Sequence, residues 1–158
     1  ISIVPARADL KSFGEGAGRA VTDALDKKDW GAALKAVKPF VENNNADALY
    51  IFGAMHAKGL GVPKNLITAR IYLKRAANQG QLKAREFLFE ELHNKMINDA
   101  EMSNNPIKII QAYKLLAEDG VPDAAEHLYY EYVLGESVPK NNKEALVWFQ
   151  RAKQLGDI

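Results

Sequence analysis

Apolar and polar positions along the chain follow the period of amphipathic helices. Apolar residues recur at the i, i+3, i+4 spacing in the stretch 48–56 and again in the stretch 69–77, which places them in one stripe of a helix in each case. No stretch alternates apolar and polar residues in the manner of a half-buried strand. The pattern therefore predicts an all-α chain built from short helices.

Glycine, asparagine and proline mark the expected ends of these helices. Glycine readily adopts the left-handed conformation that often follows a helix, and we expect it in that role at Gly59, Gly80, Gly120, Gly135 and Gly156. The expected N-caps are Asn65, Asn105 and either Asn141 or Asn142. Proline suits a first helical turn, where the amides lack partners, and stands there at Pro106 and Pro122.

The sequence repeats itself. Residues 48–80 and 124–156 align without a gap and share the pattern Gly-x-x-Val-Pro-Lys-Asn at 59–65 and at 135–141. A more divergent copy, residues 84–120, lies between them, and we expect its loop to be about four residues longer than the loops of the other two copies. Residues 30–44 correspond to the second half of one more unit. A fixed period of this length indicates stacked pairs of helices, because one pair alone cannot bury its apolar face.

A known family has the same pattern. The first unit contains Ala48-x-x-x-Phe52-Gly53-x-x-His56-x-x-Gly59-x-Gly61-Val62 and then Ala69-x-x-Tyr72-x-x-x-Ala76-Ala77-x-x-Gly80. This resembles the Sel-one-like repeat, a relative of the tetratricopeptide repeat. The resemblance extends over about residues 30–156 and is weakest in the middle unit, where Lys95 and Asn98 stand in place of the expected glycine and valine. These two departures leave the loop geometry of the middle unit undefined.

The resemblance implies a fold and a class of function. The fold is a right-handed α-solenoid of antiparallel helix pairs, an α–α superhelix with one concave side. We expect a single solenoid domain over residues 1–158, with the repeats in 30–156 and an N-terminal helix, preceded by an export-signal remnant or a linker, in 1–29. The implied function is that of an adaptor, scaffold or regulator, frequently in the bacterial envelope or secretion machinery.

The composition of the chain argues against several classes of function. Apolar residues make up 47% of the chain, which is enough for a continuous core, and the formal net charge of +1 argues against a nucleic-acid binder. There is no cysteine, so disulfides and thiolate metal sites are excluded. No apolar run is long enough to cross a bilayer, so no membrane insertion is expected. Ala6-Arg7-Ala8 has the form of a signal-peptidase site, which predicts a periplasmic or secreted protein, with a cytoplasmic location as the alternative.

Catalytic motifs are present only in part. Ser137-Val138-Pro139-Lys140 matches the S-x-x-K pattern of penicillin-interacting serine enzymes, but the repeat already explains Val138 to Lys140, and the S-D-N and K-T-G elements are missing. The three histidines fall at different repeat positions, so they are not expected to converge on a metal. We therefore predict no enzymatic activity, no cofactor and no metal, with a β-lactam or peptidoglycan hydrolase as the alternative.

Charge is distributed unevenly along the chain. Residues 45–85 have a net charge of +6 and residues 86–136 a net charge of −8. By analogy with tetratricopeptide repeats, the first helix of each unit lines the concave wall, and the residues expected there are Tyr50, Ala54, Glu86, Glu90, His93, Glu126, Tyr130 and Val133. Such a wall suits another protein or peptide with a basic segment. We expect the free chain to be a monomer.

The resulting hypothesis is a protein-binding module. One specific form of it is an immunity protein or inhibitor that blocks a secreted toxin. A self-assembling structural element is a further alternative.

Overall fold

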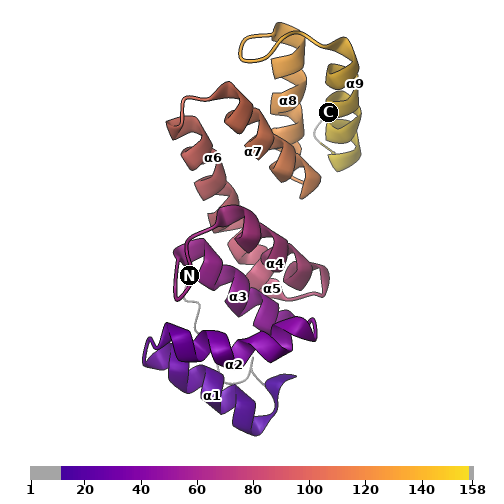
Figure 1. The fold of residues 1–158 in the computed structure, drawn as a ribbon. Coiled ribbons are helices and arrows are strands. Elements are labelled where there is room, and N and C mark those ends of the chain that lie inside the picture. Colours follow the sequence, from indigo (N-terminus) through magenta and orange to yellow (C-terminus); the bar gives the residue numbers. More distant parts are fainter. Residues whose placement is uncertain (1–11, 157–158) are drawn as a thin grey trace. The chain divides into compact units, whose positions relative to one another are not determined.

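The computed structural model describes residues 12–156, and helices make up most of them. Figure 1 shows these elements in chain order: α1 (Glu15–Asp26), α2 (Trp30–Glu42), α3 (Ala46–Lys58), α4 (Leu66–Asn78), α5 (Leu82–Glu86), the π-helix η2 (Phe87–Leu92), α6 (His93–Met102), α7 (Pro106–Glu118), α8 (Pro122–Leu134) and α9 (Asn142–Leu155). No strand occurs within residues 12–156, and the predicted all-α class is confirmed. The predicted signal-peptidase site at 6–8 lies outside the described residues.

The chain divides into two compact units, Ile1–Leu92 and His93–Ile158. In the first unit, α1 to α4 each pack on the next helix along the chain, and α5 and η2 then pack on α4. In the second unit, α6 to α9 also pack in consecutive order. This arrangement confirms the predicted α-solenoid construction from helix pairs. The prediction of one domain over residues 1–158 stays a prediction.

Asparagine side chains begin several of the helices, as predicted. The Oδ1 atom of Asn65 accepts a hydrogen bond of 2.9 Å from the backbone N–H of Thr68, at the start of α4. Asn141 does the same for α9, and its Oδ1 accepts from the amides of Lys143 and Glu144. Asn141, rather than Asn142, is therefore the cap. These bonds satisfy amides that have no partner inside the helix.

Two glycines end the first helix of a repeat. Gly59 and Gly135 have φ values of 69° and 71°, the left-handed conformation predicted for both. At Gly135 a side chain would also collide with the loop, because an added Cβ would lie 2.6 Å from Lys140 Cγ and 3.1 Å from Lys140 N. Asn44, which occupies the corresponding repeat position to Gly80, also has a positive φ of 59°. The repeat is thus visible in the backbone as well as in the sequence.

The middle repeat differs from the prediction. The expected longer loop is wrong: α5, η2 and α6 follow one another without a break over residues 82–102, and only residues 103–105 connect α6 to α7. The first helix of the other two repeats ends at Gly59 and Gly135, whereas the aligned position here is Lys95. A lysine adopts the left-handed conformation less readily than a glycine, which favours continuation of the helix at Lys95. The additional residues lengthen the helix instead of the loop.

Candidate functional site

The residues predicted to line a groove are distributed over both units. Glu86 and Glu90 lie in the first unit, one helical turn apart, and both side chains are exposed. Glu126, Tyr130 and Val133 lie in the second unit at the spacing i, i+4, i+7, which is one face of α8. Within each unit the structure therefore brings predicted residues onto a common helix face.

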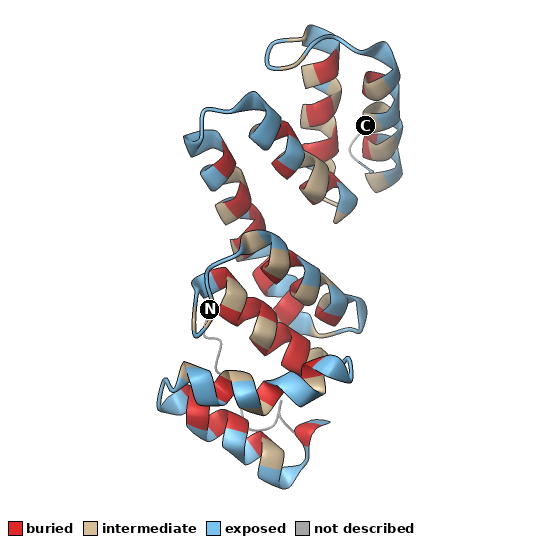
Figure 2. Ribbon diagram, viewed as in Figure 1, coloured by how far each residue is buried: buried red, intermediate tan, exposed pale blue. Residues whose placement is uncertain are grey.

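The prediction that Tyr50 and Ala54 face a partner is wrong. Both belong to the core, with no exposed surface, in a helix that packs against α2 and α4. Figure 2 shows α3 mostly in the colour of buried residues. The analogy with tetratricopeptide repeats predicted that one face of this helix is open to a partner, although its tyrosine and alanines suit a buried position equally well.

The prediction for His93 is also wrong. Its side chain is buried, and its Nε2 atom lies 2.9 Å from the Oδ2 atom of Asp119, which is buried too. Asp119 is the C-cap that follows α7, so this contact joins the start of α6 to the C-terminal end of α7. The two residues are 26 positions apart, and no local sequence signal indicates such a pair.

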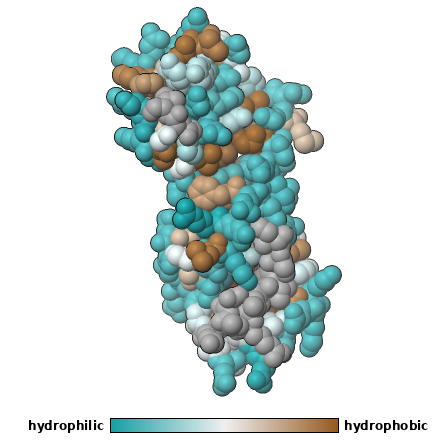
Figure 3. Space-filling model, turned by 180° about the vertical axis from the view of Figure 1, so that it is seen from behind, coloured by the Kyte–Doolittle hydropathy of each residue, from teal (hydrophilic) through white to brown (hydrophobic). Residues whose placement is uncertain are grey.

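Aromatic and apolar side chains of α8 and α9 lie on a surface that we call the α8–α9 face. The ring of Tyr129 lies 5.0 Å from that of Tyr130 and 5.5 Å from that of Phe149, measured between centroids. The residues that make up this face are Glu126, Tyr129, Tyr130, Val133, Leu146 and Phe149. Figure 3 shows apolar side chains in several places on the surface of the second unit, in the upper part of the view.

A cleft of about 270 Å³ opens in this face between α8 and α9. Its lining is mainly apolar and comprises Tyr129, Asn142, Ala145, Leu146 and Phe149. The ammonium group of Lys153 lies 5.8 Å from the centre of the Phe149 ring, at a distance that suits a cation–π contact. Sequence reasoning missed the cleft, because the helical spacing of Phe149 is typical of a core residue and gives no indication that its surroundings are partly open.

A known family model matches the repeats found in the sequence. The model of the Sel1 repeat matches residues 46–81 and 122–157. The chain contains two Sel1 repeats. The segment between the two Sel1 repeats contains the uninterrupted helix 82–102, which lacks the glycine break. Sel1 repeat proteins are generally protein–protein interaction modules.

The crystal structure of a Sel1 repeat protein from Oxalobacter formigenes is similar to this chain over 91% of its length, with 28% sequence identity and a TM-score of 0.45. The chain spans 56% of that protein. No curated protein matches the sequence.

The loop between the two helices of the second Sel1 repeat carries the serine of the S-x-x-K pattern. Ser137 is exposed, and its backbone N–H donates a hydrogen bond of 3.3 Å to Glu131 Oε2. Lys140 packs against Gly135, as Lys64 does against Gly59 in the first Sel1 repeat. The loop geometry of the repeat thus accounts for the lysine.

Two histidines pack against aromatic rings. His56 lies 4.8 Å from Phe52 and stacks on Tyr72 at 6.0 Å, between ring centroids, and burial lowers the pKa of its imidazole. His127 stacks on Tyr113 at 3.8 Å. Burial raises the pKa of the Tyr113 hydroxyl, and the carboxylates of Glu101 and Glu131 raise it further.

Within residues 12–156, no group of three or more His, Asp or Glu side chains is placed to hold a metal ion. In the same part of the chain, no helix has both the length and the apolar character needed to cross a bilayer.

Proposed function

We propose that this protein binds a partner protein through its α8–α9 face and acts as an adaptor or regulator. The observation that carries the proposal is the exposed aromatic and apolar surface of Tyr130, Val133 and Leu146 beside an apolar cleft. Soluble proteins generally keep such residues scattered, and a contiguous group next to a cleft is typical of an interaction site.

The chemistry of the face suits a protein partner. Tyrosine supplies a large contact area with few rotatable bonds, and tyrosine is among the residues that contribute most binding energy at interfaces. Glu126 lies on the same side of α8 as Tyr130, one turn earlier, where a carboxylate at the rim of an interface selects the charge of the partner. The net charge of −8 in residues 86–136 favours a basic segment in that partner.

The location and the biological role belong to the same proposal. The Ala6-Arg7-Ala8 triplet supports export to the periplasm or beyond, where an envelope adaptor would act. The role of an immunity protein, and a monomeric state of the free chain, stay predictions.

A single substitution tests the site. After affinity capture of a partner from the native organism, Tyr130→Ala should weaken its binding by about 1 to 2 kcal/mol, measured by calorimetry, because it removes an exposed aromatic anchor without opening the core. Ile67→Ala is the matched control, since Ile67 on α4 has 49% of its surface exposed, close to the 50% of Tyr130. Equal affinities for the parent and the Tyr130→Ala variant would contradict the proposed site.

A further inference from the structure

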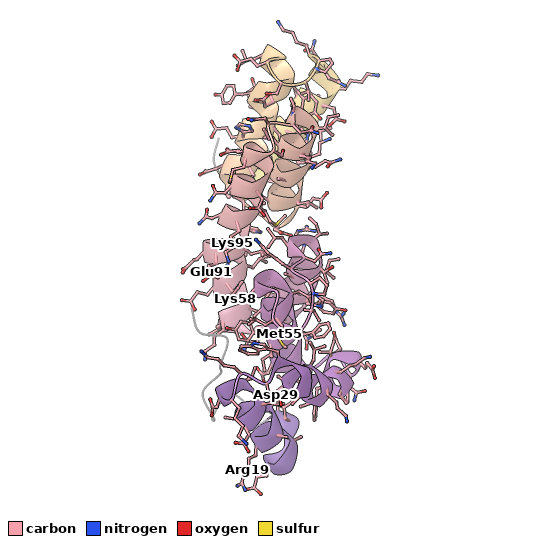
Figure 4. All side chains as sticks on the ribbon, turned by 60° about the vertical axis from the view of Figure 1, so that its left-hand side comes forward. Arg19, Asp29, Met55, Lys58, Glu91 and Lys95 are labelled. Atoms are coloured by element: carbon pink, nitrogen blue, oxygen red, sulfur yellow. The ribbon has the colours of Figure 1, made fainter. Side chains whose placement is uncertain are left out.

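Helices α6 to α8 of the second unit correspond to α1 to α3 of the first. The bounds of α2 and α3 lie 76 residues before those of α7 and α8, and α1 overlaps α6 at the same offset. In the first unit these helices contribute four apolar residues that are at most 1% exposed: Leu25, Val37, Ile51 and Met55. Figure 4 labels Met55 on α3. The residues at the same positions in the second unit are all titratable: Glu101, Tyr113, His127 and Glu131.

We call these four residues of the second unit the polar seam. The rings of Tyr113 and His127 stack with their centroids 3.8 Å apart and their planes 18° apart. The Nε2 atom of His127 lies 3.7 Å from Glu131 Oε1, and it is buried without a hydrogen-bond partner among the described residues. The Glu131 side chain is 14% exposed, and its Oε2 atom accepts the backbone N–H of Ser137. The seam thus combines an aromatic stack with a carboxylate that the neighbouring loop holds in place.

The negative charge of the seam has no lysine or arginine beside it. Within residues 12–156, neither Glu101 nor Glu131 forms an ion pair with either of these residue types. Lys114 of α7 lies instead 4.0 Å from Oε2 of Glu144. Burial raises the pKa of the Tyr113 hydroxyl, and the carboxylates of Glu101 and Glu131 raise it further. Their charge therefore acts inside the seam, where it favours a cation.

The seam reduces stability relative to the apolar residues of the first unit. Polar groups in a partly buried position cost free energy unless they are fully paired, and such departures from a core pattern are concentrated at functional sites. The seam also adjoins the proposed partner site. His127 and Glu131 directly follow Glu126 and Tyr130 on α8, so the two pairs lie on neighbouring sides of this helix.

We propose that the polar seam binds the guanidinium group of an arginine in the basic segment of the partner protein. This inference rests on the proposed function, because it names the chemical group that the partner places next to the α8–α9 face. A guanidinium is planar, stacks on aromatic rings and donates several hydrogen bonds to carboxylates. The ammonium group of a lysine has the same charge but lacks the plane that stacks on a ring.

Fluorescent peptides test the inference on the whole chain. The probe is a peptide of about ten residues that contains arginine, glycine and serine. One companion peptide has citrulline in place of each arginine, which retains the shape and removes the charge. The other has lysine, which retains the charge. By fluorescence anisotropy, we expect the citrulline peptide to bind at least about tenfold more weakly than the probe and the lysine peptide at least about threefold more weakly.

Two isosteric substitutions serve as test and matched control. Glu131→Gln removes the charge and retains an oxygen that accepts the N–H of Ser137, and it should weaken binding of the arginine peptide by about tenfold. Glu136→Gln removes the same charge from an exposed residue outside the seam and should leave binding within about twofold. Equal binding of the arginine and citrulline peptides, equal binding of the arginine and lysine peptides, or equal effects of the two substitutions would overturn the inference.

The first Sel1 repeat supplies a second variant. His127→Ile combined with Glu131→Met introduces the residues of α3 at the same positions. We expect this variant to melt at a higher temperature than the parent and to lose the preference for arginine over citrulline, because apolar packing replaces the groups that bind the cation. A lower melting temperature of both this variant and Glu131→Gln, with the arginine preference retained, would show that the seam is structural and would overturn the inference.

The two proposals fail in distinguishable ways. If Tyr130→Ala weakens binding of the captured native partner but Glu131→Gln does not, the α8–α9 face is correct and the arginine site is wrong. If Tyr130→Ala leaves binding of the native partner unchanged, the proposed function itself is wrong at this face, whatever the peptides show.

Discussion

At the scale of single residues, the turn after α8 depends on Gly135. Its φ of 71° is costly for any residue with a side chain, and an added Cβ would lie only 2.6 Å from Lys140 Cγ. Gly135→Val should therefore lower the free energy of unfolding by about 2 to 3 kcal/mol, measured by urea denaturation. Gly80→Val is the control, because Gly80 also has a positive φ, 87°, but nothing within 4 Å of an added Cβ. Equal losses in the two variants would show that the contact with Lys140 contributes nothing.

A second residue-scale prediction concerns pH. Burial lowers the pKa of His56 below its ordinary value of 6.5, so the unfolded chain binds more protons than the folded chain between the folded pKa and 6.5. Stability should therefore fall as the pH is lowered through this window and be fully retained above it. His56→Tyr, which copies Tyr132 at the equivalent repeat position, should remove this part of the pH dependence.

Thermal melting at pH 5 and pH 8 measures the effect of His56. The parent should lose more stability on acidification than His56→Tyr, and the remaining slope of the variant reports the other titrating groups. Identical pH dependence of the two proteins would contradict a lowered pKa for His56.

Local chemistry explains which residues could be predicted from the sequence. Asn65, Asn141 and Gly135 act on the backbone next to them, so their roles follow from residue type and position. The burial of Tyr50 and the pairing of His93 with Asp119 depend on helices that are distant in sequence. Neither has a local signal, and both were assigned to the wrong environment.

At the scale of elements, helix spacing predicted the faces but not the neighbours of each face. Glu126, Tyr130 and Val133 share one side of α8, as their spacing indicated. That the same side of α3 is buried could not be deduced from the pattern, because alanine is common both in cores and on surfaces. The middle helix continued to Met102 because Lys95 replaces the glycine that ends the first helix in the other repeats.

Charge reversal distinguishes the contribution of Glu126 on α8 from those of Glu86 and Glu90 on α5–η2. Glu86→Lys, Glu90→Lys and Glu126→Lys combined should weaken binding of the captured partner at least about tenfold, with the association rate most affected and with a strong dependence on salt. Glu126→Lys alone should account for most of the loss, because only Glu126 belongs to the α8–α9 face. The double variant Glu86→Lys with Glu90→Lys is the control, and surface plasmon resonance gives both rates. A loss that follows the double variant would instead place the site on α5–η2.

At the scale of the whole molecule, the repeat period gave the fold class and the construction from helix pairs. The Sel1 repeat model matches the first and last repeats, where the sequence pattern is complete. The candidate site could be predicted only in part, since Glu126, Tyr130 and Val133 came from helical spacing, while Leu146 and the cleft required the packing of α9 on α8.

The central claim is that the partner occupies the α8–α9 face. Hydrogen–deuterium exchange of the chain with and without its captured partner tests this claim most directly, because protection of backbone amides reports where binding stabilises helices. The account predicts protection concentrated in α8 and α9, with little change in α1 to α4. Protection confined to α1–α4 or to α5–η2, with α8 and α9 unchanged, would contradict it.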